Sequence, residues 1–159
     1  MSRFSYLILC SFLCLFTACG DTAATEGEEG VNSYTEAQLA EQQEASAKMM
    51  TIHDEAMARM GEMTSYEKAV TQELASGELT PDRQSQLEAV LEKLTDANDD
   101  MMEWMPTMRP ADDLLQSGEH DRVMKHYMEQ IERANQVDVQ INQSIEMAKT
   151  AMDATVEAQ

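Results

Sequence analysis

Residues 80–110, TPDRQSQLEAVLEKLTDANDDMMEWMPTMRP, hold a complete helix pattern with a start signal, an apolar stripe and a stop signal. Thr80 is a favourable N-cap residue, and Pro81 suits the first helical position, where a backbone N–H would be unbonded anyway. Pro106 and Pro110 close the pattern, because proline cannot continue a helix interior. The apolar side chains recur every three or four positions: Leu87, Val90, Leu91, Leu94, Ala97, Met101, Trp104 and Met105. The stretch therefore predicts one amphipathic helix.

Two longer helix patterns flank this stretch. Upstream, Thr35 forms a capping box with Gln38, and Gly77 supplies a stop. Its apolar stripe consists of Met49, Ile52, Ala56, Met60, Met63, Val70 and Leu74. Downstream, a pattern begins near Gly118 and continues to about Val156. Its stripe consists of Met124, Tyr127, Ile131, Ala134, Ile141, Ile145, Ala148 and Met152. No strand pattern competes with these helices.

Three helices, over about residues 35–76, 81–105 and 118–156, predict an all-α fold. Short connections make successive helices antiparallel, so we expect an elongated up-down-up three-helix bundle with coiled-coil-like packing. The outer helices, at about 40 residues, would be about 60 Å long, whereas the middle helix has only about 25 residues. The beginning of the first helix and the end of the third should therefore protrude from opposite ends of the core.

The pairing of the first two helices gives an expected register. If apolar residues face each other across the first turn, Met57 lies opposite Trp104 and His53 lies level with Met108. One end of the bundle would then be a methionine cluster around the tryptophan.

Methionine is abundant, with 14 among 159 residues. The simpler interpretation is a core in which methionine fills gaps around the single tryptophan. The alternative is a Cu(I) site, because thioether sulfur is a soft ligand that suits this ion. The candidate ligands are His53, Met57, Met60, Met63, Met101, Met105 and Met108. The trio His53-Asp54-Glu55 is otherwise typical of a helix edge that faces water.

Residues 1–18 have the layout of a secretory signal, in which Arg3 precedes an apolar run. The run has about a dozen residues, too few for the roughly 20 that a spanning helix needs. Its end resembles a bacterial lipobox, with cleavage between Ala18 and Cys19. Cys19 would then carry diacylglycerol and an N-linked acyl chain such as palmitate, and we expect no other cofactor. An ordinary cleaved signal peptide with a chance cysteine is the alternative.

Residues 20–34, GDTAATEGEEGVNSY, lack apolar periodicity and predict a disordered acidic tether. The expected organisation is a signal peptide at 1–18, a lipidated cysteine and tether at 19–34, and a helical bundle at 35–157. Gly20, rather than an aspartate, follows the lipidated cysteine. By bacterial sorting rules this favours the outer membrane, with the bundle on its periplasmic or surface face.

The chain is strongly acidic, with 30 Asp and Glu against 11 Lys and Arg and a formal net charge of −19. Loss of residues 1–18 would remove one charge, that of Arg3, and leave −20. Such a charge disfavours nucleic acid and anionic headgroups as electrostatic partners. Cys10 and Cys14 lie in the signal and lipid would occupy Cys19, so no thiol would remain for a disulfide, a zinc site or a nucleophile.

Catalytic motifs are absent from the sequence. It contains no HExxH, GxSxG, phosphate-binding loop or GxGxxG pattern. His120 and His126 have no third residue at a ligand spacing, and acidic pairs such as Asp99-Asp100 carry no specificity in so acidic a chain. We therefore expect no catalytic residues and no enzymatic activity.

Two segments resemble a group of bacterial lipoproteins that are often labelled viral A-type inclusion proteins. They are MMTIHDEAMARMGEM at 49–63 and ANDDMMEWM at 97–105, which a proline-containing turn and a long final helix follow. The resemblance extends over most of the chain after the signal. The label implies coiled-coil similarity only, and no activity or catalytic residue comes with it.

These patterns favour a lipid-anchored envelope protein with a non-enzymatic structural or protein-binding role. Its expected partners are the membrane, through the anchor, and one or more envelope proteins. Two alternatives are a methionine-rich Cu(I)-binding lipoprotein and a chaperone-like holder, for which flexible methionine surfaces would be suited.

Overall fold

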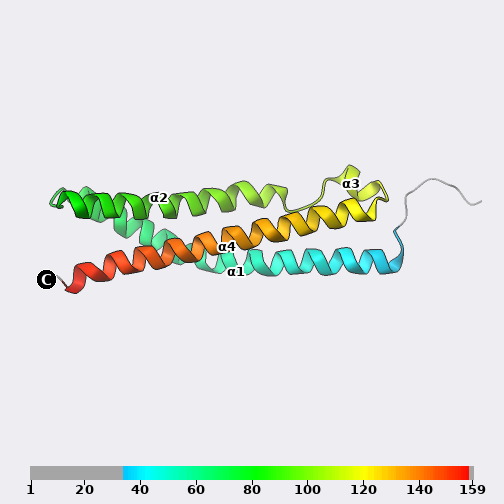
Figure 1. Cartoon of the computed structure of the whole chain (residues 1–159), viewed down its shortest axis with the longest axis horizontal. Coiled ribbons are helices and arrows are strands. Elements are labelled where there is room, and N and C mark those ends of the chain that lie inside the picture. Colours follow the sequence, from blue (N-terminus) through cyan, green and yellow to red (C-terminus); the bar gives the residue numbers. More distant parts are fainter. Residues whose placement is uncertain (1–33, 158–159) are drawn as a thin grey trace, which may run out of the picture. The chain divides into compact units, whose positions relative to one another are not determined.

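The computed structural model describes residues 34–157, and every regular element within them is helical. The elements are α1 (Glu36–Ala75), α2 (Pro81–Trp104), the 3-10 turn η1 (Met105–Thr107), α3 (Asp112–Gln116) and α4 (His120–Glu157). Figure 1 shows α1, α2 and α4 lying lengthwise beside one another, with α1 and α4 parallel and α2 antiparallel to both. The predicted all-α helical bundle is confirmed. The signal peptide, Ala18, Cys19 and residues 19–33 lie outside the described residues.

The helix starts form as the sequence predicts. The hydroxyl of Thr35 accepts from the backbone N–H of Gln38 at 3.2 Å, and the Gln38 side chain accepts from the Thr35 N–H at 2.9 Å. At the start of α2, the Thr80 hydroxyl accepts from the backbone N–H of Arg83 at 3.3 Å. These contacts satisfy backbone donors that a helix terminus leaves unbonded. Local sequence therefore determines where both helices begin.

Two boundaries differ from the prediction. Tyr34, which was assigned to the tether, belongs to the bundle, because its hydroxyl donates to the carbonyl of Leu114 at 3.3 Å. The last long helix begins at His120 and not at Gly118. Gly118 has a φ of 71°, which is a left-handed conformation that no α-helix contains. The short helix α3, which was not predicted, precedes this glycine, and Leu115 within it packs against the core.

The expectation that the first helix protrudes beyond the core was wrong. His120, the first residue of α4, lies 3.0 Å from the carboxylate of Glu41 and 3.2 Å from the amide of Gln42. The first turns of α1 therefore lie against the start of α4. At the other end, the carbonyl of Ala151 accepts from Arg83 at 2.8 Å, so α4 continues only about two turns past the start of α2. The segment with η1 and α3 is long enough to let α4 begin level with α1.

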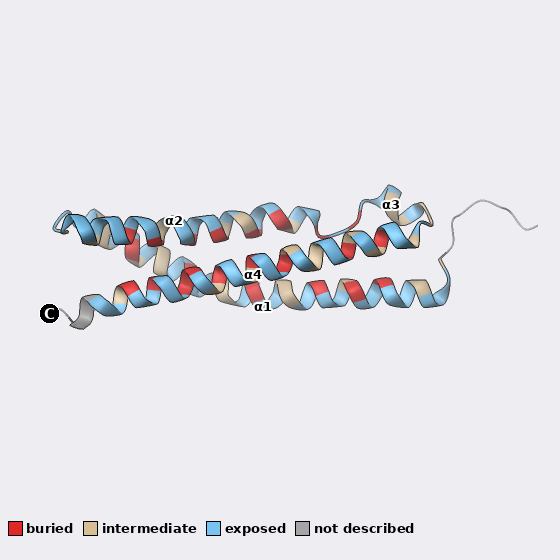
Figure 2. Cartoon of the chain, in the orientation of Figure 1, coloured by how far each residue is buried: buried red, intermediate tan, exposed pale blue. Residues whose placement is uncertain are grey.

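The core is a continuous seam along the inner faces of the three long helices, as the buried positions in Figure 2 show. In α1 its members recur every seven residues at Met49, Ala56, Met63 and Val70. In α2 the same spacing gives Leu87, Leu94 and Met101. A seven-residue repeat keeps one stripe facing its partners along helices that coil around each other. The burial pattern therefore supports coiled-coil-like packing.

The predicted register of α1 against α2 was wrong by about one helical turn. Trp104 faces His53, with 6.0 Å between the ring centroids, whereas the expected neighbour was Met57. At the turn between these helices, Nε of Arg83 donates to Oε1 of Glu73 at 2.7 Å. The apolar stripe alone does not specify which turn of α1 packs against which turn of α2. The Arg83–Glu73 pair is consistent with the observed register.

Alanine substitutions at Gly61, inside α1, and at Gly77, just after its end, should change the stability of the fold in opposite directions. A Cβ added at either Gly61 or Gly77 meets no heavy atom within 4 Å, but Gly77 has a φ of 72°. We expect Gly61→Ala to raise the free energy of unfolding by about 0.5–1 kcal/mol, because glycine weakens a helix interior. Gly77→Ala should lower it by about 1–2 kcal/mol, the cost of a left-handed alanine. Urea unfolding followed by circular dichroism measures both, and equal effects would contradict the described turn.

Candidate functional site

The last turn of α2 fixes Trp104 between the two other long helices. Its side chain is buried, and its Nε1 donates to Oε1 of Gln130 on α4 at 3.0 Å. The hydroxyl of Thr107 lies 3.0 Å from the same amide oxygen. On the side of α1, the imidazole of His53 lies against the indole at an interplanar angle of 52°. The indole is thus held from both sides, and its ring orients the histidine.

His53 presents one ring nitrogen that is available to a ligand. Its side chain is 17% exposed, and Nδ1 donates to Oδ1 of Asp54 at 2.9 Å. An ionised carboxylate only accepts hydrogen bonds, so in the neutral ring the proton is on Nδ1 and the lone pair is on Nε2. Nε2 makes no hydrogen bond within residues 34–157. An oriented imidazole with a free Nε2 lone pair is a metal-ligand geometry.

Three of the seven predicted ligands belong to the core. Met63, Met101 and Met108 are all buried. The sulfur of Met63 accepts from the hydroxyl of Ser144 at 3.7 Å, and Met63 lies about 15 Å along α1 from His53 by helical rise. These residues therefore pack the bundle as the simpler interpretation expects, and Met63 lies too far along α1 to share an ion with His53.

The other three methionines lie nearer the surface. Met57 is 40% exposed, and it follows His53 by four residues, so the two side chains are neighbours on one face of α1. Met60 and Met105 are half-buried and pack against the core. Of the predicted ligands, only Met57 therefore combines an exposed sulfur with a position beside the histidine.

Two exposed methionines near His53 are not among the ligands that the sequence predicts. Met50, 40% exposed, precedes His53 by three residues on the same face of α1. The exposed Met102 comes from α2. Asp100 and Met102 flank the buried stripe of α2 on opposite sides. Asp100 accepts from Arg133 of α4 at 3.1 Å, so Met102 is on the side of α1.

The height of Met102 follows from the register. Because Trp104 faces His53 and the helices are antiparallel, Met102 lies level with residue 55, between His53 and Met57. We call Met50, His53, Met57 and Met102 the His53 face. The spacing of its three α1 members was visible in the sequence. The sequence did not show that these side chains are exposed, or that α2 contributes Met102.

The other two histidines are engaged in helix contacts. Both ring nitrogens of His120 face partners on α1, as described above. Nε2 of His126 donates to the carbonyl of Met108 at 3.2 Å, and its ring lies edge-on to Tyr127. His120 therefore joins α4 to α1, and His126 joins α4 to the segment between η1 and α3.

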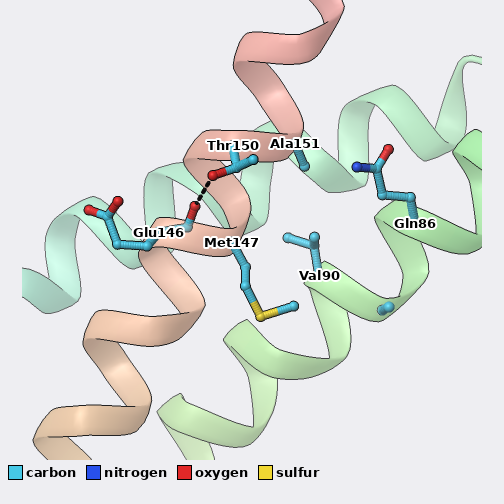
Figure 3. Close-up of a pocket in the computed structure, with 7 residues that line it drawn as sticks. Gln86, Val90, Glu146, Met147, Thr150 and Ala151 are labelled. Atoms are coloured by element: carbon cyan, nitrogen blue, oxygen red, sulfur yellow. Dashed lines mark hydrogen bonds between the residues drawn. The ribbon is translucent and has the colours of Figure 1, made fainter.

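A separate open groove of about 420 Å³ runs between α2 and α4. Figure 3 shows Met147 reaching from α4 toward α2, where Val90 lies, with Gln86 farther along the same helix. The hydroxyl of Thr150 donates to the carbonyl of Glu146 at 2.8 Å and is therefore already engaged. The groove walls thus supply apolar surface and no paired nucleophile and base.

Over residues 34–157, no three His, Cys, Asp or Glu side chains gather where they could hold a metal ion. None of the helices in this range combines the length and the apolar character that crossing a bilayer requires. Comparisons with protein-family models, with curated proteins and with solved structures give no match.

Proposed function

We propose that the chain is a lipid-anchored helical-bundle protein of the bacterial outer membrane with a structural or protein-binding role and no enzymatic activity. The observation that carries the structural part of this proposal is how the half-buried arginines within residues 34–157 are paired. Each of the three half-buried arginines joins two helices: Arg59 to Asp138, Arg83 to Glu73, and Arg133 to Asp100. Such pairs hold helices in register, so these charged groups bind other helices of the bundle.

The anchor would hold the bundle by one end. Cys19 precedes Tyr34 by 15 residues, which reach at most about 50 Å in any conformation. The 40 residues of α1 extend about 60 Å. Tyr34 contacts Leu114, so the chain enters the bundle beside α3. The α3 end would therefore be nearer the membrane, and the turn between α1 and α2 would point toward the envelope space.

The surface of α2 suits an exposed position above a membrane. Five exposed acids recur every three or four residues along it: Glu88, Glu92, Asp96, Asp99 and Glu103. Lys93 pairs with Asp96 at 3.2 Å, and the row otherwise remains negative. Such a face is repelled by anionic headgroups and is complementary to basic protein surfaces. This charge supports a bundle that stands clear of the lipid and meets protein.

Replacing Cys19 tests the anchor. In a Gram-negative host that lipidates exported proteins, Cys19→Ser should either move the chain from the membrane fraction to the soluble fraction or leave it as a precursor that retains its signal peptide. It should also abolish labelling by a clickable palmitate analogue, because the lipid-bearing sulfur is gone. Cys14→Ser is the matched control and should behave like the parent. An unchanged distribution of Cys19→Ser together with unchanged palmitate labelling would show that Cys19 carries no lipid anchor.

The partner role needs a separate measurement. Crosslinking on intact envelopes, followed by purification of the anchored chain, should recover at least one envelope protein. Recovery should be reduced by replacing the five acids of α2 with Gln and Asn, while circular dichroism remains helical. If only the chain itself is recovered from both the parent and the variant, no partner binds the acidic face.

A further inference from the structure

We propose that the His53 face binds one Cu(I) ion, with Nε2 of His53 and the sulfurs of Met57 and Met102 as ligands. Met50 lies on the same face, one turn before His53, and is not required as a ligand. This site differs from the one that the sequence suggested, because it is at the surface and excludes the buried sulfurs. It goes beyond the anchoring and scaffold role and does not depend on either.

The histidine is arranged as a metal ligand. Metal-binding histidines commonly donate their second N–H to a carboxylate, which fixes the tautomer and raises the basicity of the ligating nitrogen. The 2.9 Å contact from Nδ1 of His53 to Asp54 is such a bond. The indole of Trp104 packs against the imidazole and restricts its rotation. Nε2 has no competing hydrogen-bond partner within the described residues. Asp54 acts here as a positioning residue.

Three methionine side chains come from positions close to His53. Residues three and four apart on a helix have Cβ atoms about 5–6 Å apart, which places Met50 and Met57 on either side of His53. Met102 arrives from α2 at a level between His53 and Met57. Their exposed fractions of 40%, 40% and 55% leave these flexible side chains free to turn toward an ion.

The donor set selects the ion. Thioether and imidazole groups favour Cu(I), whereas Mg²⁺ and Ca²⁺ require oxygen ligands. The nearest carboxylate, that of Asp54, is already bonded to the histidine. A monovalent soft ion therefore fits this face better than a hard divalent ion.

The test uses the full chain in detergent with Cys10, Cys14 and Cys19 replaced by Ser, so that no thiol competes. Cu(I) is supplied anaerobically with ascorbate and a chromophoric Cu(I) chelator. We expect one ion per chain, bound with a dissociation constant below about 1 μM. Fluorescence provides a second readout, because Trp104 is the only tryptophan, and its emission should change until one equivalent has been added.

Variants identify the ligands. His53→Gln, Met57→Leu and Met102→Leu should each weaken binding at least about tenfold, and Asp54→Asn should weaken it about tenfold. Met147→Leu, which removes an equally exposed sulfur from the distant α2–α4 groove, should leave affinity unchanged. Met63→Leu should also leave it unchanged. Circular dichroism confirms that each variant is folded.

Two results would overturn the proposal. One is complete loss of Cu(I) to the chelator with no change in Trp104 emission. The other is equal weakening by Met147→Leu and Met57→Leu, which would show that exposed methionines bind Cu(I) without a defined site.

Discussion

Trp104→Ala should lower the free energy of unfolding by about 3–5 kcal/mol, the typical cost of removing a buried tryptophan. The side chain is 2% exposed and packs between α1 and α4. Its removal leaves a cavity in the part of the bundle where α2 ends and only the short elements η1 and α3 cover the long helices. Chemical unfolding of the parent and the variant, followed by circular dichroism, measures the difference.

A conservative variant separates packing from hydrogen bonding. Trp104→Phe keeps an aromatic ring against His53 but removes the N–H that donates to Gln130. Trp104→Phe should lower the free energy of unfolding clearly less than Trp104→Ala does, with about 1–2 kcal/mol from the lost hydrogen bond. If Trp104→Ala costs under about 1 kcal/mol, the indole does not pack between the helices as described.

Arg83→Met should lower the free energy of unfolding by about 2–3 kcal/mol. Its guanidinium donates to both carboxylate oxygens of Glu73, at 2.7 and 2.9 Å, and to the carbonyl of Ala151 at 2.8 Å. One side chain therefore joins α1, α2 and α4 at the end where the first turn lies. The two partners are only 17% and 18% exposed, so solvent screens this pair less than an exposed pair.

A second ion pair supplies the matched control. Arg122 pairs with Glu119 near the start of α4, and the two side chains are 67% and 50% exposed. Arg122→Met should cost less than about 0.5 kcal/mol. Added salt should reduce that small effect further and leave most of the Arg83 effect in place. Similar costs for both variants would mean that Arg83 does not join the helices at this end.

Local chemistry made the helices predictable. The hydroxyls of Thr35 and Thr80 and the prolines at 81 and 106 act within a few residues of themselves, so their effects can be seen in a single sequence. The ends of all three long helices fall within two residues of their predicted positions. The error at the start of α4 has the same local character, because the positive φ of Gly118 is set by the turn that follows α3.

The candidate site was only partly predictable. The sequence identified His53 and Met57, which neighbour each other through helical spacing alone. It also grouped Met63 with them, which the structure places in the core, and it did not include Met102. Both differences come from contacts between helices: burial of Met63 against Ser144 on α4, and the register that brings Met102 beside α1.

Caps, prolines and periodicity act along the chain, so they predict three long helices with one apolar stripe each. Which stripe positions meet is a property of the packed bundle and follows from no single helix. The stripe alone does not say which turn of one helix packs against which turn of another, and contacts between side chains far apart in sequence, such as Arg83 with Ala151 and Arg59 with Asp138, accompany the register that forms. That register places His53 against Trp104 and leaves Met50, Met57 and Met102 at the surface.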